Sequence, residues 1–171
     1  MFVPPLLPWK VLEGPLNIYK KACAEHGHKP DIVYIRPVYI DEDEKTIRRE
    51  VEQALHNFLA FNASPIESLH SEENQAELRA KGYGFYASGA LESLTTLTYD
   101  EIVNQEIGFI GPPEKVIGQI RELQAKGGIG ELAIVSNFGG LEHWKSIKTQ
   151  HMFAKHVMPA FRNTTAQAAA D

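Results

Sequence analysis

The sequence predicts an α/β protein made of repeated βα units around a parallel sheet. Two observations lead to this prediction. Short runs rich in β-branched and aromatic residues alternate with longer stretches of helical periodicity, and glycines stand where the helices are expected to end. Strands that alternate with helices pair in parallel through right-handed crossovers. The length of 171 residues fits one domain, so we expect a single domain over 1–171.

The first elements expected along the chain are a helix and a strand. The helix covers 15–26, with Pro15 in its first turn and Gly27 at its end. The strand is the run IVYIRPVYI at 32–40, although Pro37 cannot donate a hydrogen bond to a neighbouring strand.

An acidic run, DEDE at 41–44, follows this strand and predicts the start of a second helix. Either Asp41 or Asp43 can cap it, and carboxylates are favourable at a helix N-terminus. Apolar residues then recur at helical spacing: Ile47, Val51, Ala54, Leu55, Phe58 and Phe61. We therefore expect an amphipathic helix up to about residue 62.

The segment 63–105 loses this periodicity and is predicted to be a lid-like insertion. Short helices are expected around 71–81 and 89–104, and GYGFYASG at 82–89 brings glycines and aromatic rings together between them. Long connections in compact domains are often functional. Two interpretations remain open: a lid whose aromatic rings cover a ligand, or an ordinary packed loop.

The last third again predicts strands and helices in alternation. EIGFIG at 106–111 is a short strand, and a helix runs from Pro112–Pro113 to Gly127–Gly128. ELAIVSN at 131–137 holds four consecutive apolar residues, which predicts a strand covered on both faces. The tail at 164–171 is expected to fray. The final helix is expected to turn one side to the core, formed by Trp144, Ile147, Ala154, Val157 and Phe161.

The charge and cysteine content exclude several classes of function. With 17 basic and 22 acidic residues the net charge is −5, which argues against nucleic acid or an anionic membrane as partner. No stretch of 18 apolar residues exists, so no membrane span is expected. The single cysteine, Cys23, excludes an internal disulfide and suits a cytoplasmic location. His151 and His156 are five residues apart, so they do not share a helix face, and no metal site is predicted.

Candidate binding residues lie in the turn SNFGG at 136–140. The turn follows the carboxyl end of a predicted parallel strand, where α/β folds place ligand sites. Gly139 and Gly140 let the backbone approach a ligand, but an ordinary strand-to-helix turn explains the same glycines. Arg36 stands in an otherwise apolar strand and must find a carboxylate, a ligand anion or solvent. No grouping of residues identifies a catalytic acid, base or nucleophile.

Four motifs of the last third follow one another in a specific order. They are Gly111–Glu114, Gly130–Leu132, Phe138–Leu141 and Val157–Pro159. This order resembles the C-terminal end of the luciferase-like, flavin-dependent monooxygenase family, where G-x-P-E, G-[IV]-x-E-L, F-G-G-L and V-M-P motifs succeed one another. The resemblance covers 20–62 and 105–162, and it is stronger in the second segment.

The resemblance implies a (β/α)8 TIM barrel, a fold that takes about 250 residues. The three predicted strands correspond to the last three of the eight, so the chain is expected to form the C-terminal part of the barrel, incomplete at this length. We therefore expect a homodimer or completion by a missing N-terminal half. In the family, reduced flavin is held largely by groups on the earlier strands, including most of its phosphate site, and these strands have no counterpart here.

The resemblance also implies the chemistry: reduced FMN, alternatively a deazaflavin, reacts with oxygen to oxygenate an aldehyde, a ketone or another small organic substrate. A flavin reductase would supply the reduced cofactor. The alternative is a non-catalytic flavin-binding or interaction protein derived from the barrel. The residues expected at the cofactor share the turn after the last strand: Asn137, Phe138, Gly139 and Gly140. Those expected to shield the site share the glycine-rich lid: Tyr83, Gly84 and Tyr86.

Overall fold

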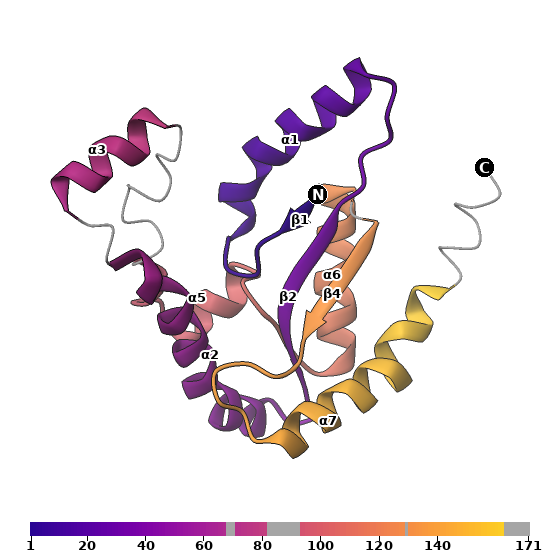
Figure 1. The fold of residues 1–171 in the computed structure, drawn as a ribbon. Coiled ribbons are helices and arrows are strands. Elements are labelled where there is room, and N and C mark those ends of the chain that lie inside the picture. The colour runs from indigo at the N-terminus through magenta and orange to yellow at the C-terminus, as the bar shows by residue number, and fades with distance from the viewer. Residues whose placement is uncertain (68–70, 82–92, 129, 163–171) are drawn as a thin grey trace.

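The structure, a computed structural model, describes residues 1–67, 71–81, 93–128 and 130–162. Within them it contains a four-stranded parallel sheet with helices on both faces (Figure 1). The α/β class with parallel strands is therefore confirmed. The strands are β1 (Phe2–Val3), β2 (Val33–Ile40), β3 (Phe109–Gly111) and β4 (Glu131–Val135).

The helices follow the strands in the alternation expected of βα units. They are α1 (Trp9–Glu25), α2 (Glu44–Glu67), α3 (Glu72–Ala80), α5 (Tyr99–Asn104), α6 (Pro113–Gly127) and α7 (His143–Met152). After α7 the chain continues as a π-helical turn, Phe153–Val157, and a 3-10 turn, Met158–Ala160.

β2 is the central strand of the sheet. Both β1 and β4 pair with its residues Val33 and Tyr34, so these two strands lie on opposite sides of it. β3 pairs with the other end of β2, at Val38–Ile40. A closed barrel pairs each strand with its neighbours in sequence, whereas β4 here pairs with β2. The sheet is consequently open.

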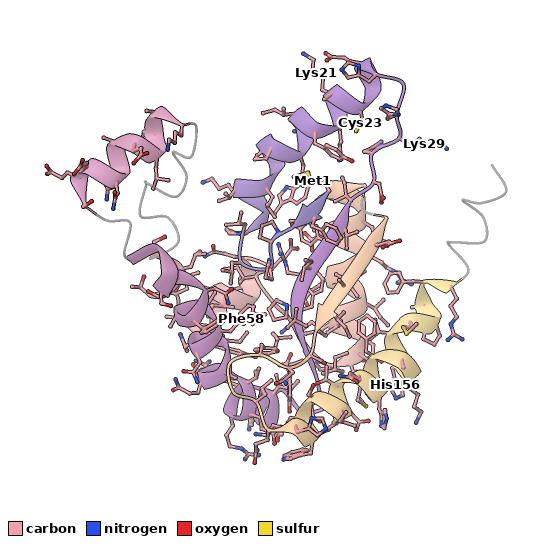
Figure 2. The ribbon with its side chains drawn as sticks, viewed as in Figure 1. Met1, Lys21, Cys23, Lys29, Phe58 and His156 are labelled. Atoms are coloured by element: carbon pink, nitrogen blue, oxygen red, sulfur yellow. The ribbon has the colours of Figure 1, made fainter. Side chains whose placement is uncertain are left out.

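Alternate residues of β2 face two different helix layers. Tyr34, Val38 and Ile40 belong to a core shared with α1 and α6. Tyr39 belongs to the opposite core, which α2 and α5 cover. In Figure 2, Phe58 lies on the side of α2 that faces the sheet, in agreement with its packing against this second core.

Several of the expected elements are confirmed. β2 matches the strand predicted at 32–40. Asp43 begins α2, since its carboxylate accepts a hydrogen bond from the Thr46 amide at 2.9 Å. α6 begins at the paired prolines and ends at Gly128, whose φ of 60° stops the helix.

The structure corrects the expectation for the first helix. α1 begins at Trp9, so Pro15 lies inside the helix rather than in its first turn. The buried positions Leu12 and Leu16, four residues apart, fix the helix by packing on the sheet, and this packing outweighs the cost of the proline. β1, a strand of two residues, was not predicted.

The expectation for β4 is also wrong, whereas that for the last helix is confirmed at Val157, which is buried in the core, and wrong at Trp144 and Ile147. β4 is not covered on both faces: Glu131 is exposed and the rest of the strand is half-buried, because the strand lies at an edge of the sheet. On α7, Trp144 and Ile147 are 52% and 36% exposed, and the buried residues are Ser146 and Thr149. The segments 82–89 and 164–171 lie outside the described residues.

Candidate functional site

The carboxyl ends of the parallel strands meet at one edge of the sheet, where α/β proteins place their ligands. β2 ends before Asp41, β3 ends at Gly111 and β4 ends before Ser136. We call this the carboxyl edge. α7 contacts β2 beside it, and Figure 1 shows the helix beneath the end of the sheet.

A polar network joins α7 to the carboxyl edge. Lys148 of α7 forms an ion pair with Asp41, and Gln150 donates a hydrogen bond to the Ser136 hydroxyl at 2.8 Å. The Ser136 and Ser146 hydroxyls are 3.1 Å apart. Each of these buried hydroxyls has a partner, so the network explains why α7 buries small polar residues instead of apolar ones.

The turn after β4 packs closely against α2. Phe138 is 3% exposed and meets the Phe58 ring edge-on, with the ring centroids 5.8 Å apart. A Cβ atom on Gly139 would lie 1.7 Å from the backbone oxygen of Ala54. The carbonyl of Gly139 accepts a hydrogen bond from the Asn57 side chain at 3.0 Å. Gly139 is therefore required for the contact between the turn and α2.

Two residues of the predicted cofactor set remain open to a ligand. Asn137 and Gly140 are both exposed. Gly140 has a φ of +83°, and a Cβ built there would meet nothing within 4 Å. The predicted lid residues Tyr83, Gly84 and Tyr86 lie outside the described residues.

A small cavity of about 180 Å³ lies at the carboxyl end of β3, lined among others by Arg48, Tyr99 and Lys115. Both cations are already paired. Arg48 binds Glu52 at 3.2 Å and Asp100 at 3.3 Å, and Lys115 binds Glu44 at 3.5 Å. Because α6 begins with proline residues, this helix N-terminus also presents fewer amide donors than usual.

Arg36 is buried, only 1% exposed, and its partners are backbone carbonyls. It donates to the carbonyls of Pro4 at 2.9 Å, Leu7 at 2.7 Å and Glu106 at 2.8 Å. Burial lowers its pKa to about 10, and its guanidinium lies 4.2 Å from the centre of the Tyr34 ring. The expectation of a carboxylate, a ligand anion or solvent is wrong, because carbonyls from distant segments supply the acceptors instead.

Two further searches concern only the part of the chain that the structure describes. None of its helices is both long and apolar enough to cross a bilayer. Its His, Cys, Asp and Glu side chains form no group of three or more that could hold a metal ion.

The carboxyl edge of this parallel sheet carries an exposed asparagine and an open glycine turn, at the end of the strands where α/β proteins as a class place their ligands. The sequence profile of luciferase-like monooxygenases matches residues 1–129, and the chain belongs to this family. The match covers all of the resembling segment 20–62, and it covers the segment 105–162 as far as residue 129.

Solved monooxygenases share the fold over most of the chain. Monooxygenase RslO1 from Streptomyces bottropensis aligns at a TM-score of 0.63 and 21% identity, over 94% of this chain and 41% of its own. The oxygenating constituent of 3,6-diketocamphane monooxygenase from Pseudomonas putida is a type II Baeyer–Villiger monooxygenase solved with FMN. It aligns at a TM-score of 0.53 and 17% sequence identity, over 86% of this chain and 39% of its own. The chain thus spans about two fifths of each, and no curated protein matches it.

Proposed function

We propose that the chain is the C-terminal part of a flavin-dependent monooxygenase. In this proposal reduced FMN and oxygen act on an aldehyde, a ketone or another small organic substrate, and a reductase supplies the reduced flavin. The observation that supports it is the match of the luciferase-like monooxygenase profile to residues 1–129. The Pseudomonas putida relative in complex with FMN favours FMN as the cofactor.

The carboxyl edge offers a place for the flavin ring. Asn137 carries a side-chain amide that can both donate to and accept from the polar rim of the ring. Gly140 beside it leaves the space of a side chain open. Phe138 and Gly139 contribute indirectly, because their packing against α2 fixes the turn that presents Asn137.

The phosphate of FMN needs partners of its own, apart from those of the ring. Near the carboxyl edge Lys148, Lys115 and Arg48 are each bound to a carboxylate. A phosphate needs unpaired cations or a run of free amides. These three cations are therefore not available to a phosphate, and we expect the phosphate to be held by another part of the barrel.

Titration of the ¹⁵N-labelled full chain with FMN tests this proposal by NMR. We expect the amide signals of Asn137 and Gly140 to shift with one saturation curve, since both lie against the ring. Gly118 serves as the control signal, because it is exposed on α6, away from the carboxyl edge. The variant Asn137→Ala should weaken FMN binding several-fold, through the loss of one hydrogen bond worth about 1 kcal/mol. Unchanged signals at Asn137 and Gly140, with shifts elsewhere, would contradict the proposal.

A further inference from the structure

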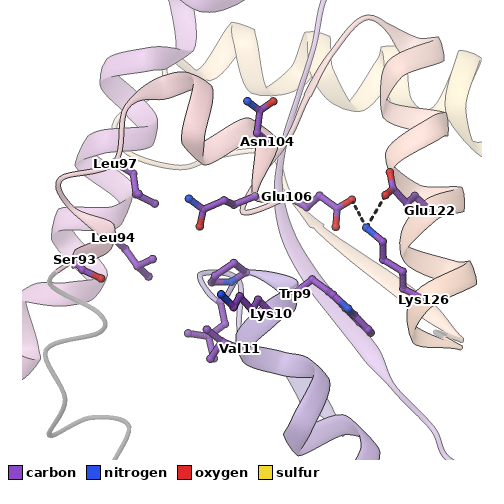
Figure 3. Close-up of a pocket in the computed structure, with 13 residues that line it drawn as sticks. Trp9, Lys10, Val11, Ser93, Leu94, Leu97, Asn104, Glu106, Glu122 and Lys126 are labelled. Carbon is purple, nitrogen blue, oxygen red and sulfur yellow. Dashed lines mark hydrogen bonds and ion pairs between the residues drawn. The ribbon is translucent and has the colours of Figure 1, made fainter.

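A second cavity, of about 700 Å³, opens between the start of α1, the segment 93–97, the end of α5 and the end of α6 (Figure 3). We propose that this cavity, the edge cavity, binds a small monocarboxylate with an apolar body. Its volume lies within the range of about 300–1,000 Å³ that is usual for small-molecule sites. The inference does not depend on the proposed flavin chemistry.

The edge cavity is separate from the carboxyl edge. Glu106 on its wall precedes β3, and Lys126 lies near the end of α6, before β4 begins. Both residues are therefore on the amino-terminal side of their strands. A ligand here would not compete with one beside Asn137.

One part of the wall is apolar. Leu94 is buried, and Leu97 and Val11 are half-buried, so these side chains leave apolar surface for an aliphatic or aromatic body. Figure 3 shows Leu94 and Leu97 together on one side of the cavity. Each buried methylene of a ligand contributes about 0.8 kcal/mol at such a surface.

The polar part of the wall contains hydrogen-bond donors that have no partner within the described part of the chain. Within the described part of the chain, the side chains of Lys10, Asn104 and Gln105 make no hydrogen bond or ion pair. In contrast, the other lysine of the wall, Lys126, pairs with Glu106 at 3.3 Å and with Glu122 at 2.6 Å. Lys10 and Gln105 both line the cavity, so an ammonium group and an amide group are available to one carboxylate.

The backbone at Glu106 holds one part of the wall in place. Glu106 has a φ of 57°. Among the described residues, it is the only one other than glycine with a positive φ. The carbonyl of Glu106 accepts a hydrogen bond from the buried Arg36 at 2.8 Å. This positive φ belongs to the end of α5, where the Glu106 amide donates to the Val103 carbonyl and the Ile107 amide to the Ile102 carbonyl, each at 3.1 Å, as in a Schellman motif. The end of α5 and the bond from Arg36 together fix the position of Glu106 in the wall.

Tryptophan fluorescence provides the test, because Trp9 lines the edge cavity and the chain has two tryptophans. In the full-length variant Trp144→Phe, Trp9 is the sole emitter. Sodium octanoate should change its emission along a saturable curve with one site per chain. Octanol, which has the same apolar body without the charge, should bind at least about tenfold more weakly, because it forms no charge-assisted hydrogen bond.

Two further variants locate the ligand. Lys10→Gln, at an exposed position, should weaken octanoate at least about fivefold and leave octanol unchanged, since charge-assisted hydrogen bonds contribute most of the difference. Leu97→Ala should weaken both ligands. Lys155→Gln, exposed beyond α7, is the matched control and should change neither.

The proposal is overturned if calorimetry and fluorescence both show no saturable binding of octanoate. It is equally overturned if octanol binds as tightly as octanoate, or if Lys10→Gln has no effect. A change in Trp9 emission with protein concentration alone, without added ligand, would show that a second copy of the chain fills the cavity instead.

Discussion

Gly139 connects the turn after β4 to α2 at a point with no space for a side chain. The Cβ position of any other residue would lie 1.7 Å from the Ala54 carbonyl oxygen, and the φ of +58° adds strain. Gly139→Val should therefore lower the free energy of unfolding by about 3 kcal/mol, measured by urea denaturation.

Gly140→Ala is the matched control for this variant. Its φ of +83° is also unfavourable for alanine, but its side-chain space is empty. We expect a loss of about 1 kcal/mol. If the two variants lose the same stability, the close contact between Gly139 and α2 is not present in solution.

Arg36 joins the loop after β1 to the residues before β3. Arg36→Met should lower the free energy of unfolding by about 3 kcal/mol, because it leaves the carbonyls of Pro4, Leu7 and Glu106 without a donor in a buried place. Arg36→Lys keeps the charge but cannot reach all three carbonyls, so its loss in thermal or urea unfolding should be intermediate. A Met variant as stable as the wild type would show that water replaces the guanidinium.

At the scale of secondary structure, α1 contains an unusual interior residue. Pro15 is exposed and cannot donate a hydrogen bond to the carbonyl of Val11 one turn earlier. Pro15→Ala should raise the free energy of unfolding by about 1–2 kcal/mol. Alanine has a much higher helix propensity than proline, and this gain exceeds the loss that comes from the greater conformational entropy of the unfolded chain without the proline. Gly118→Ala, exposed on α6 with open space, is the control with an expected gain of up to about 1 kcal/mol. A less stable Pro15→Ala would mean that the proline shapes α1 for packing.

Local patterns were sufficient to predict β2, α2 and α6, because their apolar spacing and capping residues lie within the elements themselves. The half-buried state of β4 could not be predicted, since the composition of a strand does not reveal how many neighbours it has. The core face of α7 was predicted wrongly because the buried face of this helix satisfies polar groups at the carboxyl edge, so that Trp144 and Ile147 are left exposed.

The same distinction applies to the candidate site. The position of the glycine turn at the carboxyl edge followed from the order of strand, turn and helix. Its contact with Ala54 joins residues far apart in the sequence, and so do the contacts between Arg36 and the carbonyls of Pro4 and Glu106. No local spacing encodes such contacts.

At the scale of the whole molecule, the sheet is open and leaves apolar surface uncovered. Phe2 on β1 is 73% exposed, and β4 is half-buried along most of its length. Exposed strand edges recruit other chains. We therefore expect a two-fold dimer that buries on the order of 2,000 Å² or more.

Light scattering combined with urea unfolding at several protein concentrations measures this association. The expected result is a dimer mass at micromolar concentration and stability that falls on dilution. Phe2→Ser should weaken the dimer, whereas Lys155→Gln, at a position without apolar surface, should not. A monomer mass with unfolding independent of concentration would refute the dimer.

The central claim is that the chain carries the ring side of a flavin site and lacks its phosphate side. Absorbance titration of the purified full chain with FMN and with riboflavin tests it most directly, because the two ligands differ only by the phosphate. We expect a colourless protein as purified, and FMN affinity within about threefold of riboflavin affinity, a difference below 1 kcal/mol. A yellow protein that retains one FMN per chain, or binds FMN at least about a hundredfold more tightly than riboflavin, would contradict the claim.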